Sequence, residues 1–180
     1  FPPWAPELPI HIHAAMEPAR EVGGDLYDCF PIGAGSFCFL VGDVSEKGAP
    51  AALFMARTRS LVRVAVDLHA RLAPGGARSP AGIAATVNGE LCQNNDERMF
   101  VSLFLGFLDT RTGTLLYLNA GHPPPLLLAA AARPPESLSG EAQMPLGIRR
   151  NTSYRDDQVT LTAGDMLFVY SDGVPEAMNG

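Results

Sequence analysis

Short apolar runs separated by turn-forming residues make up most of this chain, and helical periodicity is confined to two stretches. Residues 51–69 contain good helix formers without Gly or Pro, and Pro50 stands where the first helical turn begins. Their apolar side chains fall roughly on one stripe, which predicts an amphipathic helix packed on a core. The stripe consists of Leu53, Phe54, Leu61, Val64, Ala65 and Leu68. A second helix is predicted over residues 81–94.

The other apolar segments are short, as is typical of β-strands. Residues 37–41 form an apolar run that ends in Gly42-Asp43, which predicts a buried strand followed by a turn. Further strands are predicted at residues 10–14, 99–108, 114–118 and 126–128. Residues 73–80 and 129–144 are predicted to be loops because Pro and Gly interrupt them.

Two pairs of strands are expected to be joined by short turns. Residues 109–113 end in Gly and connect two apolar segments, as in a β-hairpin. Residues 159–161 and 166–170 are expected to pair around a turn at 163–165. Strands, then two helices, then mostly strands is an order that indicates an α+β fold with antiparallel sheets.

The size and composition fit one globular domain. The chain has 180 residues, of which 47% are hydrophobic and 18% charged, enough for a substantial core. Residues 1–9 contain several prolines and are interpreted as a linker or arm. The domain is therefore expected to span residues 10–180.

Charge and cysteine usage exclude several classes of function. The net charge is -6 and no basic run occurs, which argues against nucleic acid as a partner. No apolar run reaches the roughly 18 residues that a membrane span requires, so direct membrane insertion is not expected. Cys29, Cys38 and Cys92 form no CxxC pair, which argues against a zinc ribbon or a disulfide framework. A cytoplasmic location with reduced thiols is the expectation.

Three acidic segments, at residues 23–28, 41–48 and 170–174, carry the candidate chemistry. In the last two, an apolar strand leads to an Asp beside a Gly, namely Asp43 and Asp172. Carboxylates that converge from separate strand ends suit Mg²⁺ or Mn²⁺, which prefer oxygen ligands. Asp-Gly is also a common turn signal, so each segment alone is better explained as a turn, and only the three together favour a cation site.

The string REVGGDLYD at residues 20–28 resembles the first motif of the stage II sporulation protein E phosphatases. That family belongs to the metal-dependent, protein phosphatase 2C-like superfamily. Four further segments resemble family motifs in the family's order. They are residues 41–48 with the helix segment 51–56, residues 119–125, residues 144–147 and residues 167–177.

The resemblance implies an α/β/β/α sandwich of two antiparallel sheets flanked by helices, with two Mn²⁺ or Mg²⁺ ions at one end. By resemblance, Asp43 bridges both ions, the Val44 carbonyl also binds, and Asp25 and Asp172 serve one ion each. A metal-activated water would attack phosphorus directly, and Asp43 and Asp25 would be catalytic through this water. The absence of GxSxG and CxxxxxR patterns fits a mechanism without a protein nucleophile.

The chain departs from the family pattern in two places. Glu46 stands where the family usually has Gly, so it is expected to strain the turn or to add an acidic group near the metals. The family's closing strand, with Asp-Asp-x-Thr, has no counterpart before Gly180, so the domain is expected to lack its C-terminal strand and one metal ligand. Asp156-Asp157 precedes the fifth motif and is interpreted as a solvated turn.

Other polar residues near the motifs have two interpretations each. Lys47 and Arg20 are candidates for attracting a phosphorylated substrate, or they are ordinary surface cations. His122 either orients Asn119 and its loop or acts as an acid near phosphate. A zinc site that combines His11 and His13 with Cys29 or His122 matches no usual spacing.

The helix after the second motif is a candidate regulatory switch, because the family's equivalent helix is thought to couple regulation to the metal site. Ala51, Phe54 and Met55 are its candidate regulatory residues, and Phe54 and Met55 are also expected in the core.

The leading hypothesis is a Ser/Thr protein phosphatase output domain. By resemblance, its substrate is a phosphorylated regulatory protein such as an anti-sigma-factor antagonist in bacterial signalling. An upstream sensor or receiver domain and a homodimer are further expectations. The alternative is a pseudophosphatase that keeps the fold and sequesters a partner without turnover.

Overall fold

A computed structural model describes residues 10–16, 23–72, 78–130, 134–138, 140–141 and 143–176. The arm expected at residues 1–9 and the candidate Arg20 lie outside these residues. The elements are β1 (Leu26–Gly33), β2 (Ser36–Val44), α1 (Ala49–Leu72), α2 (Pro80–Leu91), β3 (Val101–Asp109), β4 (Thr114–Ala120), β5 (Leu126–Leu128), β6 (Glu136–Ser137), β7 (Asp157–Thr160), β8 (Met166–Phe168) and α3 (Gly173–Glu176).

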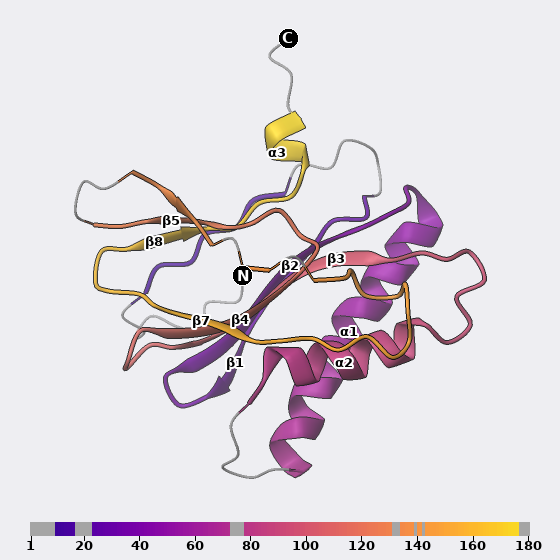
Figure 1. The fold of residues 1–180 in the computed structure, drawn as a ribbon, viewed down its shortest axis with the longest axis horizontal. Coiled ribbons are helices and arrows are strands. Elements are labelled where there is room, and N and C mark those ends of the chain that lie inside the picture. Colours follow the sequence, from indigo (N-terminus) through magenta and orange to yellow (C-terminus); the bar gives the residue numbers. More distant parts are fainter. Residues whose placement is uncertain are drawn as a thin grey trace.

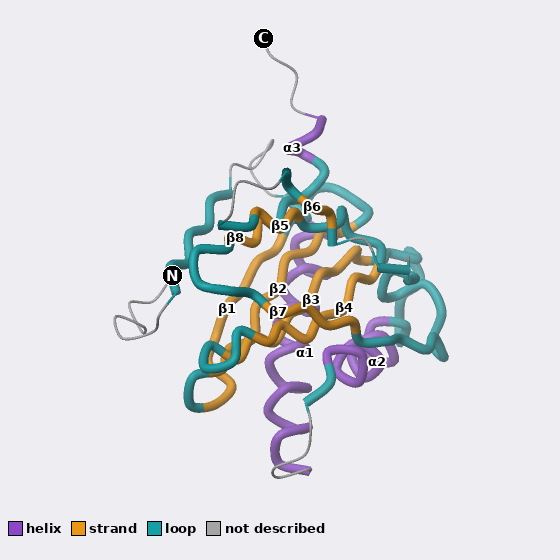
Figure 2. The backbone as a smooth tube through the Cα atoms, turned by 60° about the vertical axis from the view of Figure 1, so that its left-hand side comes forward, coloured by secondary structure: helices purple, strands orange, loops and turns teal. Residues whose placement is uncertain are grey.

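The strands form two antiparallel sheets (Figure 1). The larger sheet has five strands in the order β1-β2-β3-β4-β7, and the smaller has three in the order β6-β5-β8. Helices α1 and α2 cover one face of the larger sheet, and the smaller sheet lies toward its other face (Figure 2). The prediction of an α+β sandwich is confirmed. Among the described residues, α1 and α2 form its helical layer.

The central strands are apolar on both faces because alternate side chains enter two different cores. In β2, Cys38 and Leu40 belong to the core beneath the helices. Their neighbours Phe37 and Phe39 pack in the core between the sheets. The fully buried Phe104 of β3 joins this second core and stacks on Tyr117, with ring centroids 5.4 Å apart. The predicted buried strand at 37–41 is therefore confirmed, and its lack of alternation follows from two-sided burial.

Helix α1 exists as predicted, but its apolar stripe is only half right. Phe54 and Ala65 are buried and Leu61 packs against the core, whereas Leu53 is 73% exposed and Val64 is 62% exposed. The remaining buried positions are taken by residues outside the predicted stripe, namely Ala51, Thr58, Val62 and Val66. The buried positions of α1 are Ala51, Phe54, Thr58, Val62, Ala65 and Val66.

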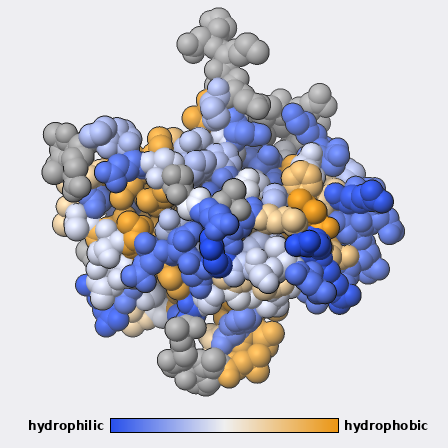
Figure 3. All heavy atoms as spheres, in the orientation of Figure 1, coloured by the Kyte–Doolittle hydropathy of each residue, from blue (hydrophilic) through white to orange (hydrophobic). Residues whose placement is uncertain are grey.

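The exposed apolar side chains of α1 continue to its C-terminal end. Leu68 is 43% exposed and Leu72 is 75% exposed. Figure 3 shows an apolar patch at the bottom of the molecule, where Figure 1 places the end of this helix. None of the described helices is long and apolar enough to cross a membrane.

Helix α2 begins within the segment that was predicted to be a loop. Ser79 is its N-cap, and its hydroxyl accepts a hydrogen bond from Gly82 N at 3.0 Å, while Pro80 occupies the first turn. Serine caps and an N-terminal proline are ordinary features of a helix start, so the loop prediction was too long at this end.

Three strand predictions were wrong or incomplete. Residues 10–14 are described without strand pairing. Strand β1 was not predicted, because Asp28, Pro31 and Gly33 interrupt its apolar pattern. Strands β7 and β8 do not pair with each other, since β7 pairs with β4 in the larger sheet and β8 pairs with β5 in the smaller one.

The segment between β7 and β8 carries the chain from one sheet to the other. The Asp165 carboxylate accepts hydrogen bonds from Thr162 N at 2.8 Å and from Ala130 N at 3.0 Å. The second bond holds the turn near the end of β5 and brings β8 alongside that strand.

The hairpin predicted over 109–113 is confirmed, with Gly113 N donating to Asp109 O at 2.8 Å.

Candidate metal centre

The register of the larger sheet brings the first two acidic segments together. The pairing of β1 with β2, continued one residue before Leu26, sets Asp25 opposite Asp43. The pairing of β2 with β3 sets Asp43 opposite Ser102. Directly opposite residues of an antiparallel pair have Cβ atoms about 4.5–5.5 Å apart. We refer to Asp25, Asp43 and Ser102 as the cross-strand row.

The cross-strand row lies on the face of the sheet that looks toward the smaller sheet. Along β2, Phe37 and Phe39 pack in the core between the sheets. Asp43 follows at the same period of two and therefore points to the same side. Because β2 ends at Val44, the Asp43 carboxylate lies at the edge of the sandwich, where the core between the sheets ends.

Glycines allow the strands to approach closely at this edge. A Cβ at Gly42 would lie 2.7 Å from Ser102 O. A Cβ at Gly24 would lie 3.0 Å from Val44 O and 3.2 Å from Glu46 O. The ladder continues here through a hydrogen bond from Val44 N to Gly24 O at 3.3 Å. The Gly-Asp spacing of the first two motifs thus places each carboxylate beside a glycine at which a side chain would crowd backbone oxygens, most severely at Gly42.

The third acidic segment reaches this edge from the smaller sheet. Strand β8 ends at Phe168, and Ser171 and the exposed Asp172 follow it. The Ser171 side chain lies close to Asp25 and acts to lower the pKa of that carboxyl. The Asp172 charge acts to raise the pKa of both Asp25 and Asp43. Sequence reasoning did not single out Ser102 or Ser171, since only the register and this contact give them a place at the site.

Burial and mutual repulsion disfavour ionisation of these carboxyls. Burial first, and then the charges of Asp25 and Asp172, raise the pKa of Asp43 to about 6. The nearby Lys47 and a hydrogen bond from the Val44 backbone oppose this rise. The pKa of Asp25 is also raised, chiefly by burial.

The donor set and its charge fit a divalent cation. Asp25 Oδ1 is buried and has no hydrogen-bond partner, so one carboxylate oxygen is desolvated without compensation. Such a group is costly unless a proton or a cation neutralises it. Within the described part of the chain, no three His, Cys, Asp or Glu side chains already surround a common point. The three carboxylates are therefore near enough to repel one another without forming a closed cage.

The second Asp of the first motif belongs to the opposite face of the sheet. Asp28 is only 6% exposed and accepts hydrogen bonds from Arg63 Nε at 2.5 Å and Arg63 Nη2 at 2.7 Å. Arg59 adds a contact of 3.1 Å, and Cys29 N donates at 2.9 Å. Burial alone would raise the pKa of Asp28, but these two arginines outweigh it and lower the pKa. The group fastens β1 to α1 and takes no part in the cross-strand row.

The loop after Asp43 presents charged side chains to solvent. Lys47 is exposed, and its charge acts on Asp43, so it lies within electrostatic reach of the site. Glu46 is also exposed, and its φ is not positive, since Asn94 and Arg98 are the non-glycine residues with positive φ among those described. The expected backbone strain at Glu46 is therefore not observed.

His122 is buried beside the cross-strand row and is only 4% exposed. Its N donates to Asn119 Oδ1 at 2.8 Å, and Asn119 Nδ2 donates to His122 O at 2.9 Å. Burial lowers the pKa of His122 to about 4, against the raising effects of the Tyr170 backbone and Asp172. A buried, neutral imidazole supports the orienting role and disfavours that of an acid near phosphate.

The zinc alternative gains no support from the described residues. His11 and His13 are exposed on a segment without strand pairing. Cys29 is buried in the core between the sheets, and burial raises the pKa of its thiol to about 12. A thiol in that state is a poor ligand for a cation.

The candidate regulatory residues lie in or against the core beneath the helices. Ala51 and Phe54 are buried there and Met55 packs against it, as expected for the latter two. A Cβ at Gly147 would lie 3.4 Å from Phe54 Cζ, so α1 contacts the fourth motif directly. A regulatory role for these residues stays a prediction.

Asp156 is not a solvated turn residue, although the sequence suggested one. Its carboxylate accepts a hydrogen bond from the Ser79 hydroxyl at 2.6 Å and another from Ala81 N at 2.7 Å. It therefore caps the start of α2. Asp157, its neighbour, begins β7.

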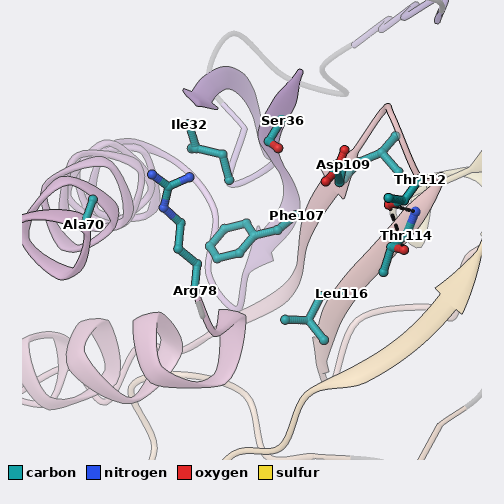
Figure 4. Close-up of a pocket in the computed structure, with 10 residues that line it drawn as sticks. Ile32, Ser36, Ala70, Arg78, Phe107, Asp109, Thr112, Thr114 and Leu116 are labelled. Carbon is teal, nitrogen blue, oxygen red and sulfur yellow. Dashed lines mark hydrogen bonds between the residues drawn. The ribbon is translucent and has the colours of Figure 1, made fainter. Parts of the chain in front are cut away.

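A cavity of about 490 Å³ lies at the other end of the larger sheet, next to the β1–β2 and β3–β4 turns. Figure 4 shows the Arg78 side chain reaching toward Phe107 and Ile32 there, with Asp109 on the far wall. Strand β2 runs from Ser36 in this cavity to Asp43, which separates the two places by the length of the strand.

The sandwich and the acidic edge together define a protein phosphatase 2C-like domain. Residues 33–180 match the family of Stage II sporulation protein E (SpoIIE). The chain belongs to this family.

Similar proteins come from several bacteria. The chain is 32% identical to Protein IcfG of Synechocystis sp. over 92% of its own length and 29% of that protein. It is 29% identical to Phosphoserine phosphatase RsbU of Bacillus subtilis over 94% of its length and 48% of that protein. It thus spans less than half the length of either relative.

A solved structure of the RsbU and RsbW domains of a Mycobacterium tuberculosis protein matches with a TM-score of 0.73 and 26% identity. The match covers 88% of this chain and 41% of that one. It agrees with the two-sheet sandwich described above.

Proposed function

We propose that this chain is the output domain of a metal-dependent protein phosphatase that removes phosphate from Ser or Thr of a regulatory protein. The observation that carries the proposal is the uncompensated pair of opposed carboxylates, Asp25 and Asp43, with Asp172 nearby. Like charges directly opposite on paired strands are destabilising. A site that concentrates them at an open edge is suited to cations that in turn hold a phosphoryl group.

The ions in this proposal are two Mn²⁺ or Mg²⁺. Asp43 would bridge them, Asp25 and Asp172 would bind one each, and the Val44 carbonyl would be a further ligand. When bound, such ions activate water as a nucleophile and neutralise phosphoryl charge. Carboxylate and carbonyl oxygens are the ligands that these hard cations prefer.

The remaining residues of the site hold and orient these groups. The Ser171 side chain acts on Asp25 and would help to hold the Asp172 segment beside the cross-strand row. Lys47, exposed beside Asp43, would attract the phosphate of an incoming substrate. Arg20, in the first motif, is a second candidate for this role. Asp25 and Asp43 would be catalytic through the water that the cations activate.

The proposed substrate is a phosphorylated regulatory protein such as an anti-sigma-factor antagonist. The support is membership of the SpoIIE family and the similarity to Phosphoserine phosphatase RsbU. Helix α1, which contains Ala51, Phe54 and Met55 and contacts the fourth motif, would transmit signals from an upstream sensor or receiver domain. Its exposed apolar residues would suit an interface, including one between two copies of the chain.

The test is hydrolysis of a phosphoserine protein in the presence of Mn²⁺. Wild-type chain, a C-terminally extended chain, Asp43→Ala and the surface variant Asp67→Asn are compared. We expect release of phosphate by wild type and Asp67→Asn, and a loss of at least about a hundredfold in Asp43→Ala, which exceeds typical losses for outer-shell residues. Activity of Asp43→Ala equal to that of wild type would show that the metal assignment is wrong.

A pseudophosphatase is the second candidate. It is favoured because the described residues hold no ready-made cage of three metal-binding side chains. In that case a phosphorylated or unphosphorylated partner would bind without turnover. Stable binding of the phosphoprotein with no phosphate release, by both the chain and its extended form, would favour this candidate over the enzyme.

A further inference from the structure

His122 links the two sheets at the acidic edge. Its backbone is fixed by two reciprocal hydrogen bonds to Asn119, at the end of β4. The preceding Gly121 has a φ of 72°, and a Cβ there would lie 2.6 Å from Pro145 Cγ. The turn that holds the imidazole is thus locked on both sides, by hydrogen bonds and by close packing that requires glycine.

On one side, the imidazole contacts the cross-strand row. His122 Nδ1 lies 3.0 Å from Ser102 Oγ. Ser102 is the direct partner of Asp43 across the β2–β3 pair, and directly paired side chains share a face of the sheet. The ring therefore supports the neighbour of the carboxylate proposed to bridge the cations.

On the other side, the ring meets the segment that carries Asp172. The Tyr170 backbone and the Asp172 charge both act on the imidazole. Nε2 is buried and has no hydrogen-bond partner among the described residues. The Ser102 hydroxyl can donate to Nδ1, and the neutral ring then carries its proton on Nε2, on the side of the Tyr170 backbone.

We propose that His122 is a positioning residue, which holds the 170–172 segment against the strands that carry Asp43 and Asp25 and so sets the affinity for the proposed cations. This role rests on the proposed function. The ring is not in a position to touch substrate, because it is buried beside the row and only 4% exposed. Ser102 is half-buried, so a nucleophilic Ser102 with His122 as its base is the alternative that the Ser102→Ala variant tests.

The two nitrogens can be tested separately. His122→Asn places an amide oxygen near the Nδ1 position and keeps the contact with Ser102, but it does not reach Tyr170. His122→Gln places an amide donor near the Nε2 position and keeps the reach to Tyr170. Ser102→Ala removes the contact on the Nδ1 side alone. His69→Gln, near the C-terminal end of α1 where the half-buried His69 contacts Thr86 of α2 at 3.1 Å, is the matched control.

The measurement is Mn²⁺ affinity by titration calorimetry, with hydrogen exchange of residues 169–172 as a second observable. We expect His122→Asn to weaken Mn²⁺ binding by about 10–100-fold, as for outer-shell partners of metal ligands, and to speed exchange in this segment. His122→Gln should lose less than His122→Asn, and His69→Gln should bind like wild type. Ser102→Ala is the milder change and should weaken Mn²⁺ binding a few-fold. Circular dichroism establishes that each variant is folded.

The outcomes separate this role from the proposed function. Equal Mn²⁺ affinity in wild type and in all three site variants would overturn the positioning role and leave the phosphatase proposal intact. Loss of turnover in Ser102→Ala with unchanged Mn²⁺ affinity would overturn it in favour of a nucleophilic serine. A wild type that binds no Mn²⁺ would overturn the proposed function, and the positioning role with it.

Discussion

Two carboxylates of the first motif, one in strand β1 and one just before it, have opposite electrostatic surroundings. Asp28 points toward the helices, where Arg59 and Arg63 surround it and lower its pKa despite its burial. Asp25, three residues earlier, points toward the smaller sheet, where Asp43 and Asp172 are its charged neighbours. The first motif thus carries a neutralised acid, Asp28, on one face of the sheet and an uncompensated acid, Asp25, on the other, just before β1 begins.

The difference separates carboxylates that stabilise the fold from those available for chemistry. A buried charge persists when partners compensate it, and its removal leaves those partners unpaired. Carboxylates held close together without a partner lower the stability of the fold, and binding of a cation or a proton restores it. The first motif contains both kinds within four residues, so its two aspartates should respond in opposite directions to the same substitution.

The largest expected effect is at Asp28. Asp28→Asn should lower the free energy of unfolding by about 3 kcal/mol. The substitution removes the negative charge of the buried carboxylate and leaves Arg59 and Arg63 without their anionic partner. The shift of the urea midpoint measures this loss. The control Asp67→Asn removes an exposed partner of Arg71 and should shift the midpoint far less. Equal shifts in the two variants would show that the Asp28 group does not hold β1 to α1.

The next effect comes from the cation proposed for the other face. Mn²⁺ at one hundred times its dissociation constant should stabilise wild type by about 2.7 kcal/mol, and removal of the metal by a chelator should reverse the gain. Thermal unfolding with and without Mn²⁺ measures it. Asp43→Asn should abolish the gain, whereas Asp67→Asn should retain it. A gain that survives in Asp43→Asn would place the cation elsewhere.

The sequence predicts single elements well because their signals are local. The run at 37–41, the hairpin at 109–113 and the helix after Pro50 are each determined by adjacent residues, and each is confirmed. Strand β1 was missed because Asp28 and Pro31 break its apolar pattern, and only Arg59 and Arg63 from a distant helix make Asp28 acceptable there.

Long-range arrangement could not be predicted in the same way. The separation of β7 and β8 into different sheets depends on strand pairing. The cross-strand row depends on the register of the paired strands, which cannot be read from the motifs around Asp25 and Asp43. The resemblance to a family identifies these carboxylates as candidate metal ligands. Only the structure shows that Ser102 pairs with Asp43 and that His122 contacts Ser102.

A smaller effect should appear in the pH dependence of Asp43. Its pKa in the folded protein is about 6, above the ordinary value of 3.8, so ionisation costs stability as pH rises through 6. In metal-free protein, Asp43→Asn should therefore stabilise by about 1.5 kcal/mol at pH 7, after discounting the full shift for partial solvent screening. The gain should shrink toward pH 5, where the folded wild type has bound the proton.

The measurement is the difference in urea unfolding free energy between Asp43→Asn and wild type at the two pH values. The difference is needed because His122 has the opposite trend: its pKa is lowered to about 4, so its burial costs stability as pH falls below 6.5. That contribution is common to both proteins and cancels. A difference that grows toward pH 5 would contradict the raised pKa of Asp43.

The smallest effect concerns a third kind of carboxylate, which neutral donors satisfy in place of charges. Asp156 accepts hydrogen bonds from the Ser79 hydroxyl and Ala81 N at the start of α2. Asp156→Ala should lower the free energy of unfolding by about 1 kcal/mol, as for loss of a helix cap, and Asp156→Asn, which keeps an acceptor, should lose less. Because this carboxylate is remote from the cation edge, the Mn²⁺-induced stabilisation should be unchanged in both variants. An altered Mn²⁺ response would mean that α2 and its cap belong to the metal centre, and the division between fold-stabilising and cation-binding carboxylates would then fail at Asp156.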